Sequence, residues 1–271
     1  MKKLLVTILI IVMSVAVFTA CGSKESKVDY GEGFVFKHGF DRDFPPYSHI
    51  DDNGKTSGLD IELAQAVCKY YGWEYEPVAI NWDAKDAELE AGSIDCIWSG
   101  FTKSPLREDK YAWSEPYSIN TIMIMVNEES DIKTKADLAG KKVGVQTTTS
   151  AQEMLELADE EGGCKDLADT FASIEVYDTY TTAITDLKAG AIDAIAIDVT
   201  MGNYEMGKVD GLVYLDEKIC DEIYAIGFRT ADTELRDLVN EGMKAIAEDG
   251  TMDAIGKNYP DIYENLTMIN N

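Results

Sequence analysis

The sequence contains one short pattern twice: it reads LEAGSIDCI over residues 89–97 and LKAGAIDAI over residues 187–195. In each copy, an amphipathic stretch ends at a glycine, Gly92 or Gly190, and an Ile-Asp step leads into an apolar run. Glycine is favoured just after a helix because it adopts the left-handed conformation without strain. We therefore predict two similar α/β lobes, each with a helix, a glycine stop and a buried strand.

Strand-like and helix-like patterns alternate around the two repeats. This alternation is typical of βαβ units with parallel strands. We expect strands over residues 34–37, 73–78, 142–145 and 174–177, and helices over residues 58–71, 151–159, 181–189, 232–248 and 252–258.

Two further apolar strands, over residues 121–126 and 223–228, have no counterpart in the repeats. They lie where the chain would pass from one lobe to the other and back, so we predict that they form a hinge. The fold class is then α/β, with two Rossmann-like lobes joined by two hinge strands. The first lobe would comprise residues 33–126 and 221–271, and the second, inserted lobe residues 127–220.

Residues 1–20 have the pattern of a secretory signal: a basic start, an apolar run over residues 4–17 and two small residues before Cys21. An uncleaved membrane anchor is the alternative, but the run is short for a span of ~20 residues. We expect Cys21 to carry a lipid and residues 21–32 to form a flexible tether. The protein would then be exported and lipid-anchored on the outer face of a cell membrane, as on a Gram-positive surface.

The chain is strongly acidic, with 50 Asp and Glu residues against 24 Lys and Arg residues and a formal net charge of −26. This charge repels nucleic acids, so we expect no nucleic-acid partner. His38 and His49 are not part of a cluster with metal-ligand spacing, so we expect no metal and no cofactor.

Four cysteines follow Cys21. Cys68 lies in an expected helix and Cys96 in an expected buried strand, so we expect both to be apolar core thiols. Cys164 and Cys220 are a candidate disulfide pair, since export permits disulfides.

Polar and aromatic side chains follow the ends of the expected strands, where open parallel sheets bind ligands. Arg107 offers a planar fork for a carboxylate, and Asp198, in the opposite lobe, suits an ammonium group. These two charges would match an amino-acid zwitterion. Hydroxyl groups and aromatic walls would complete the site: Ser99, Thr102, Thr149 and Ser150 supply the hydroxyls, and Phe44 and Trp82 the walls.

Several motifs stand in a fixed order along the chain: DRDFPPY over residues 41–47, GLDIELA over 58–64, SGFT over 99–102 with Arg107, SEPY over 114–117, and DLAGKKVGVQ over 137–146. Together they resemble the polar-amino-acid solute-binding proteins of ABC importers, family 3. The resemblance covers nearly all of the chain after the signal. It implies the type II fold of periplasmic binding proteins, whose lobes close on an amino acid. It also implies delivery to the permease subunits of an importer, with its ATPase as an indirect partner, by a monomer.

The resemblance also assigns roles. It implies that Arg107 clamps the ligand carboxylate, that Asp198 binds the ammonium group, and that Phe44 and Trp82 cover the ligand. Ser99, Gly100, Thr102 and the turn at Thr149 and Ser150 would donate to the carboxylate. The segment 146–150 lacks a glycine often found in the family, which leaves open which of its residues touches the ligand.

In the family, the position of Asp41 often reads the ligand side chain. Because an acidic ligand would meet Asp41 without a dedicated cation, we expect a neutral-polar or basic side chain. Glutamine, histidine, arginine and lysine fit this expectation, with cystine a lesser option. Arg42 would admit an acidic side chain if it turned inward.

Other functions on the same fold are a dehydratase-like enzyme or a ligand-sensing module. No nucleophile–base pair is apparent in the expected site, so we predict a protein without catalytic residues. Several residues have structural interpretations instead. We expect Asp60 and Glu62 to be solvated helix-start residues, Asp95 and Asp193 to fix strand-entry turns, and Trp98 to lie in the core.

Overall fold

The computed structural model describes residues 28–51 and 53–270. The expected signal over residues 1–20 and the lipidation site at Cys21 lie outside these residues. From Gly31 onward the chain forms one compact unit.

The first lobe is built on a five-stranded mixed sheet in the order β5-β1-β6-β13-β7. β1 runs parallel to β5 and β6, and β13 is antiparallel to β6 and β7. The strands are β1 (Val35–Asp41), β5 (Glu74–Ile80), β6 (Cys96–Ile97), β7 (Ala112–Trp113) and β13 (Gly227–Phe228). The helices of this lobe are α1 (Leu59–Tyr71), α2 (Lys85–Ala91), α7 (Thr233–Glu248), α8 (Thr251–Gly256) and α9 (Pro260–Tyr263), with the short helices η1 (Trp82–Ala84) and η2 (Pro105–Lys110). A small sheet contains β2 (Asp43–Phe44), β3 (Ser48–Ile50) and β4 (Thr56–Ser57).

The second lobe is built on another five-stranded sheet, in the order β10-β9-β11-β8-β12. β10, β9 and β11 are parallel to one another. β8 pairs antiparallel with β11, and β12, at the edge of the sheet, pairs antiparallel with β8. The strands are β8 (Ser118–Asn127), β9 (Lys142–Gln146), β10 (Ser173–Tyr177), β11 (Ala194–Asp198) and β12 (Leu212–Tyr224). The helices are α3 (Ser150–Glu156), α4 (Lys165–Ala168), α5 (Tyr180–Ala189) and α6 (Val199–Met206), with η3 (Lys135–Leu138) and η4 (Asp159–Glu161).

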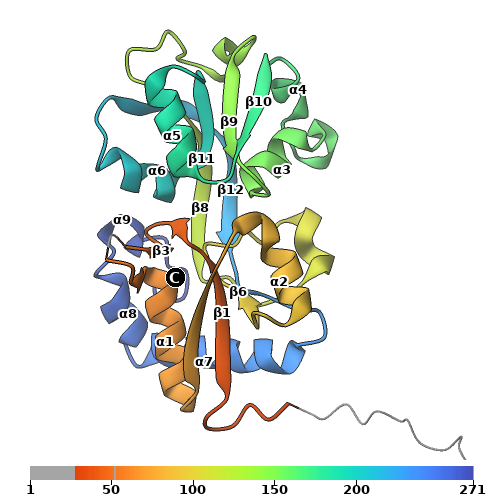
Figure 1. Cartoon of the computed structure of the whole chain (residues 1–271), viewed down its shortest axis with the longest axis vertical. Coiled ribbons are helices and arrows are strands. Elements are labelled where there is room, and N and C mark those ends of the chain that lie inside the picture. The colour runs from red at the N-terminus through yellow and green to blue at the C-terminus, as the bar shows by residue number, and fades with distance from the viewer. Residues whose placement is uncertain (1–27, 52, 271) are drawn as a thin grey trace, which may run out of the picture. The chain divides into compact units, whose positions relative to one another are not determined.

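Strands β8 and β12 join the two lobes. They pair from Ser118 opposite Tyr224 to Asn127 opposite Leu212, with register shifts between Tyr214 and Cys220, and Figure 1 shows them running from one lobe into the other. The expected lobe borders, at 126/127 and 220/221, fall inside these strands. The expected strand over residues 223–228 is divided, because the chain leaves β12 at Tyr224 and enters the first lobe's sheet as β13.

Both glycine stops predicted from the repeats are confirmed. Gly92 and Gly190 follow α2 and α5 with φ of 74° and 73°, and each donates its N–H to the last turn of its helix. Asp95 and Asp193 also hold equivalent positions, since their carboxylates accept the N–H groups of Lys37 and Lys142 at 2.8 Å. Each aspartate thus ties the entry of its strand to the neighbouring parallel strand, as expected.

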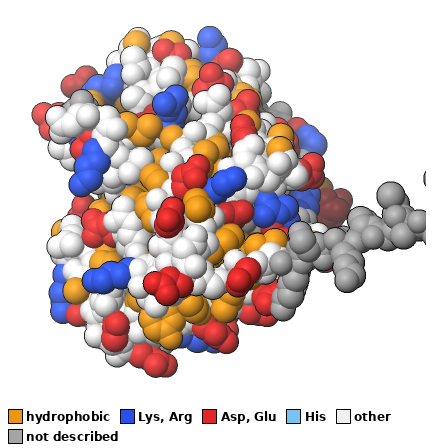
Figure 2. All heavy atoms as spheres, turned by 60° about the horizontal axis from the view of Figure 1, so that its bottom comes forward, with side chains coloured by type: hydrophobic (Ala, Val, Ile, Leu, Met, Phe, Trp, Pro, Cys, Tyr) orange, Lys and Arg blue, Asp and Glu red, His pale blue; other side chains and the backbone are white. Residues whose placement is uncertain are grey.

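The surface carries charges of both signs. On the face in Figure 2, basic side chains are scattered among acidic and apolar ones and form no broad basic patch. Within residues 28–51 and 53–270, no helix is long and apolar enough to span a bilayer.

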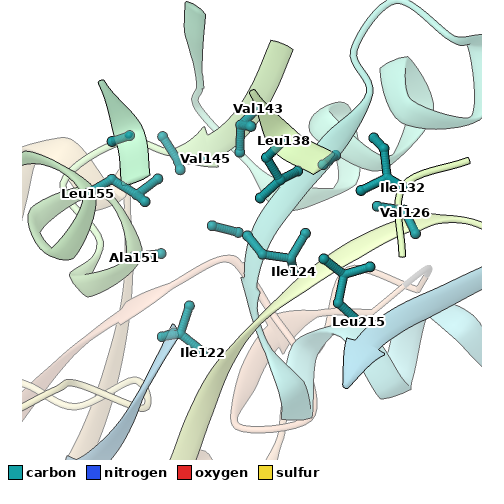
Figure 3. Close-up of a cluster of buried hydrophobic side chains, with 13 residues drawn as sticks. Ile122, Ile124, Val126, Ile132, Leu138, Val143, Val145, Ala151, Leu155 and Leu215 are labelled. Atoms are coloured by element: carbon teal, nitrogen blue, oxygen red, sulfur yellow. The ribbon is translucent and has the colours of Figure 1, made fainter. Parts of the chain in front are cut away.

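The core of the second lobe lies between its sheet and α3. Ile122, Ile124 and Val126 of β8 belong to one cluster of buried side chains with Val143 and Val145 of β9 (Figure 3). Residues two apart in a strand share a face, which explains the spacing in both segments. Full burial of each such side chain stabilises the fold by roughly 1.5–3 kcal/mol.

Two expectations need correction. Cys164 and Cys220 do not form a disulfide, since both are free thiols. The expected helix over residues 151–159 ends at Glu156, because Leu157 is extended with ψ of 136°. Cys68, Cys96 and Trp98 are buried, as expected of core residues.

Candidate functional site

A small cavity lies at the carboxyl ends of the parallel strands of both lobes. All ten residues predicted for the site line it, together with Gln146, which belongs to the segment 146–150 whose contact residues the sequence left open. The lining residues are Asp41, Phe44, Trp82, Ser99, Gly100, Thr102, Arg107, Gln146, Thr149, Ser150 and Asp198. All are buried, and the cavity measures about 20 Å³, which is room for roughly one water molecule.

The elements explain why these residues converge. Asp41 ends β1, Gln146 ends β9 and Asp198 ends β11, while the segment 98–102 follows β6. Parallel strands bring their carboxyl ends to one edge of a sheet, so residues distant in sequence become neighbours. The two edges face each other because β8 and β12 connect the lobes.

Arg107 is 3% exposed. Its Nε pairs with Glu153 Oε1 of the second lobe at 2.9 Å, and its Nη1 and Nη2 donate to the carbonyls of Thr102 and Thr148. Its guanidinium also lies 5.0 Å from the centre of the Phe101 ring. These hydrogen bonds use three of the five N–H donors of an arginine. With respect to the described residues, two donors therefore remain for a ligand, and the buried position keeps water from competing for them.

Asp198 is also 3% exposed. Its Oδ1 accepts hydrogen bonds from Asn120 Nδ2 at 2.9 Å and Tyr224 Oη at 2.5 Å. Asn120 Nδ2 lies 2.8 Å from Glu222 Oε2 as well. Burial, and then the charge of Glu222, raise the pKa of the Asp198 carboxyl well above its usual range. A cation placed here would stabilise both carboxylates.

Thr102 was expected to donate to a ligand carboxylate through its hydroxyl. In the structure this hydroxyl lies 2.7 Å from Glu222 Oε1 and 3.3 Å from Ser150 Oγ. A hydroxyl has one hydrogen, and the shorter contact, to a carboxylate, is the stronger one. In this arrangement, Thr102 therefore donates to Glu222 rather than toward a ligand. Glu222 and Asn120 were missed because both occur within the hinge strands, which were interpreted as connections.

The interpretation of Asp60 as a solvated helix-start residue is wrong. Its side chain is buried, and its Oδ2 accepts the N–H of Gly100 and the hydroxyl of Tyr117, both at 2.8 Å. Burial raises the pKa of Asp60 to about 7. Its spacing from the buried Ala64 and Val67 placed it on the apolar face of α1, and this signal outweighs the preference of acidic residues for a helix start. Asp60 therefore fixes the backbone of the cavity wall at Gly100.

Lys85 is a further residue that the sequence did not single out. It begins α2 and is buried, with Nζ 2.9 Å from Thr148 Oγ1 in the other lobe and 5.0 Å from the centre of the Trp82 ring. Burial lowers its pKa to about 8. Thr148 has φ of 54°, a left-handed conformation that costs roughly 1–2 kcal/mol for a residue with a Cβ. Gln152, which accepts the Thr148 N–H at 2.7 Å, and Lys85 hold this turn in place of the glycine that it lacks.

Several hydrogen bonds connect the lobes around the cavity. Gln146 Nε2 donates to Asp41 Oδ2 at 2.9 Å, and Thr181 Oγ1 donates to Asp43 Oδ1 at 3.1 Å. Together with the Arg107 and Lys85 contacts, they show a closed arrangement of the lobes. No group of described residues has the composition and spacing of a metal site.

Comparison with known proteins agrees with this geometry. Residues 36–261 match the model of the bacterial extracellular solute-binding proteins, family 3. The chain belongs to this family. The family predicted from the sequence is thus confirmed, and so is the type II fold with two lobes.

Family 3 relatives include the L-cystine-binding protein TcyJ of Escherichia coli, which is 31% identical over 82% of this chain and 80% of its own length. They also include the ABC transporter arginine-binding protein 1 of Escherichia coli, 28% identical over 94% of this chain and 97% of its own. A solved structure of an ABC uptake transporter substrate-binding protein from Streptococcus pneumoniae, with bound histidine, superposes with a TM-score of 0.79. It is 30% identical and the match covers 86% of this chain and 94% of that one. All three are named as binding proteins.

Proposed function

We propose that this family 3 protein is an exported lipoprotein that captures a polar amino acid between its lobes and delivers it to an ABC importer. The observation that carries the proposal is the placement of Arg107 and Asp198. A buried guanidinium from one lobe and a buried carboxyl group from the other line one cavity. This pair matches the carboxylate and ammonium groups that all α-amino acids share.

Each charged group of the amino-acid zwitterion has a partner in the cavity wall. The two remaining N–H groups of Arg107 donate to the ligand carboxylate as a bidentate pair. Asp198 receives the ammonium group, which supplies a cation to the Asp198–Asn120–Glu222 group; among the described residues, no Lys or Arg forms an ion pair with either carboxylate. Phe44 and Trp82 cover the ligand between these ends.

Ligand entry requires the lobes to separate. An amino acid is several times larger than a water molecule, and the closed cavity measures only about 20 Å³. Since β8 and β12 are the strands that connect the lobes, bending within this pair opens and closes the site. The ligand replaces some of the lobe-to-lobe hydrogen bonds with contacts of its own, and so stabilises closure.

The cavity also favours a class of side chain. Asp41 lines it, whereas the neighbouring Arg42 is exposed. An acidic side chain would therefore meet a carboxylate in a buried site, which is costly. We propose a neutral-polar or basic ligand, consistent with the cystine, arginine and histidine in the names of the relatives.

Delivery of the amino acid to the importer follows from the location of the protein. With a lipid on Cys21, the protein remains at the outer face of the membrane, where it acts as a monomer and meets the permease. We propose that it performs no chemistry, and that the ligand leaves unchanged.

A thermal-shift screen of the twenty amino acids, cystine and ornithine tests the function directly. We expect one or a few polar amino acids to raise Tm, because a ligand that binds only the folded state stabilises it. Calorimetry then gives Kd, and chromatography of the released ligand shows whether it is unchanged. The proposal fails if no amino acid raises Tm, or if a recovered ligand has been converted.

A further inference from the structure

Lys85 is a buried cation at the contact between the two lobes, and it is not one of the residues that line the ligand cavity. It begins α2 of the first lobe and is 4% exposed. Its Nζ donates to Thr148 Oγ1 at 2.9 Å and to the Thr148 carbonyl at 3.3 Å, both in the second lobe, and lies 3.5 Å from the Trp82 carbonyl of its own lobe. When the lobes separate, Thr148 leaves and water can reach the ammonium group. Closure therefore buries the charge of Lys85.

This buried charge has no charged partner. The acceptors of Lys85 are neutral oxygens, and among the described residues it forms no ion pair. Asp83 and Asp86 are its neighbours in sequence, but both are exposed, so solvent screens their charges. Neutral acceptors do not compensate an ammonium group fully for the water that it loses. Burial, and then the charge of Arg107, lower the pKa of Lys85 to about 8, which means that the charged form is disfavoured in the closed arrangement.

Arg107 brings a second cation to the same point. Its Nη2 donates to the Thr148 carbonyl, which Lys85 also contacts, at 3.2 Å. On the side of the second lobe, Glu153 pairs with Arg107 through Oε1, and its buried Oε2 has no hydrogen-bond partner among the described residues. Closure without a ligand thus brings two cations and one anion together around Thr148. A ligand carboxylate on Arg107 adds the second anion.

We propose that Lys85 is a positioning residue that holds the ligand-free protein open, because its buried charge makes closure unfavourable until a ligand carboxylate binds Arg107. This inference rests on the proposed function and deepens it. In the ligand-free protein the lobes separate and Lys85 is hydrated. With the ligand in place, its carboxylate balances the two cations, and Lys85 then holds the Thr148 turn. Closure therefore responds to the negative charge of the ligand.

Small-angle scattering of the ligand-free protein tests this inference and needs no ligand. Lys85→Met keeps much of the side-chain length and removes the charge, whereas Lys85→Arg keeps the charge. Lys110→Met makes the same change at an exposed position of η2 and is the control. At pH 7, the radius of gyration of Lys85→Met should fall toward the value expected for closed lobes. The wild type, Lys85→Arg and Lys110→Met should keep a larger radius.

The pH supplies a second readout, which a merely steric role of Lys85 would not affect. Lysine with a pKa of about 8 in the closed state and near 10.4 in water loses its proton on closure between these values. As the pH rises from 7 to about 10, the wild type should therefore become more compact relative to Lys85→Arg, whose charge persists. The other charged groups that act on Lys85 or on which it acts are present in both proteins: Arg107, Glu153, Asp83, Asp86 and Asp41.

Equal radii of the wild type and Lys85→Met at pH 7 overturn the inference. A larger radius of Lys85→Met overturns it too, because Lys85 would then be a latch that favours closure. A wild type that keeps the same radius relative to Lys85→Arg over the whole pH range contradicts the role of the charge. The proposed function fails through a different result, the absence of any amino acid that raises Tm, so the two failures are distinguishable.

Discussion

The side-chain amide of Asn120 bridges the carboxylates of Asp198 and Glu222, at 2.9 and 2.8 Å. One neutral donor thus serves two buried acidic groups on β11 and β12. Burial and the neighbouring Glu222 keep the pKa of Asp198 raised in this state. The protein therefore retains a proton at Asp198 at a pH where an exposed aspartate has lost it.

The first prediction concerns the proton that Asp198 retains. A ligand ammonium favours ionised Asp198, so ligand binding should release protons and the affinity should increase as the pH rises from 5.5 toward 8. Calorimetry in buffers of different ionisation enthalpy measures the number of protons released. Asp210→Asn, at an exposed position, is the control and should behave as the wild type. Binding that takes up protons, or none, contradicts the assignment of Asp198.

Arg107→Ala should weaken binding by well over about 2 kcal/mol, or well over about 30-fold in Kd, because the ligand carboxylate loses its buried partner. Arg107→Lys should recover only part of this loss, since an ammonium group cannot make a bidentate pair. Lys110→Ala, an exposed residue of the same short helix, serves as the control. An Arg107→Ala variant within a few-fold of the wild type would refute the clamp.

Lobe closure should be visible in solution. We expect the radius of gyration from small-angle scattering to fall when ligand is added, because contacts such as Gln146–Asp41 form between lobes that otherwise separate. Asp198→Ala, with its weakened ligand binding, should show no such fall at the same ligand concentration. An unchanged radius in the wild type, under conditions where calorimetry shows saturation, would argue for a rigid protein.

Asp60 should make stability depend on pH. Its pKa is about 7 in the folded protein and near 3.9 when unfolded, so the folded state binds more protons between these values. The free energy of unfolding should therefore decrease as pH rises from about 4 to 7, and Asp60→Asn should reduce this slope. Urea denaturation at several pH values measures it, with Asp261→Asn, exposed in α9, as the control. An identical slope in Asp60→Asn would contradict the assigned pKa.

Cys21 should be the first residue of the processed protein and should carry the lipid. Mass spectrometry of protein extracted from membranes checks both points, and Cys21→Ser should release the protein into the soluble fraction. A different first residue, or an unmodified cysteine, would contradict lipid anchoring.

Local sequence patterns were sufficient for the fold and for most of the cavity wall. The glycine stops at Gly92 and Gly190 follow from spacing alone, since each depends on its own helix. The first strand was expected over residues 34–37 but continues to Asp41, and the role of Asp41 came from the resemblance to the family. The contacts between the lobes cannot be derived from such local spacing. Nothing near Gln146 or Lys85 indicates which residue of the other lobe it meets, because this depends on how two separate sheets face each other.

The pairing of Asn127 with Leu212 means that the chain leaves β8 and returns in β12 at adjacent points of one ladder. The segment between them can therefore be exchanged as a cassette without moving the ends to which it is attached. A chimera that received residues 128–211 from another family member would keep Arg107 and the other first-lobe groups that recognise the carboxylate, but would replace Thr149 and Ser150. It would gain a new partner for the ammonium group and for Asp41, so ligand preference could change through recombination as well as through point substitutions.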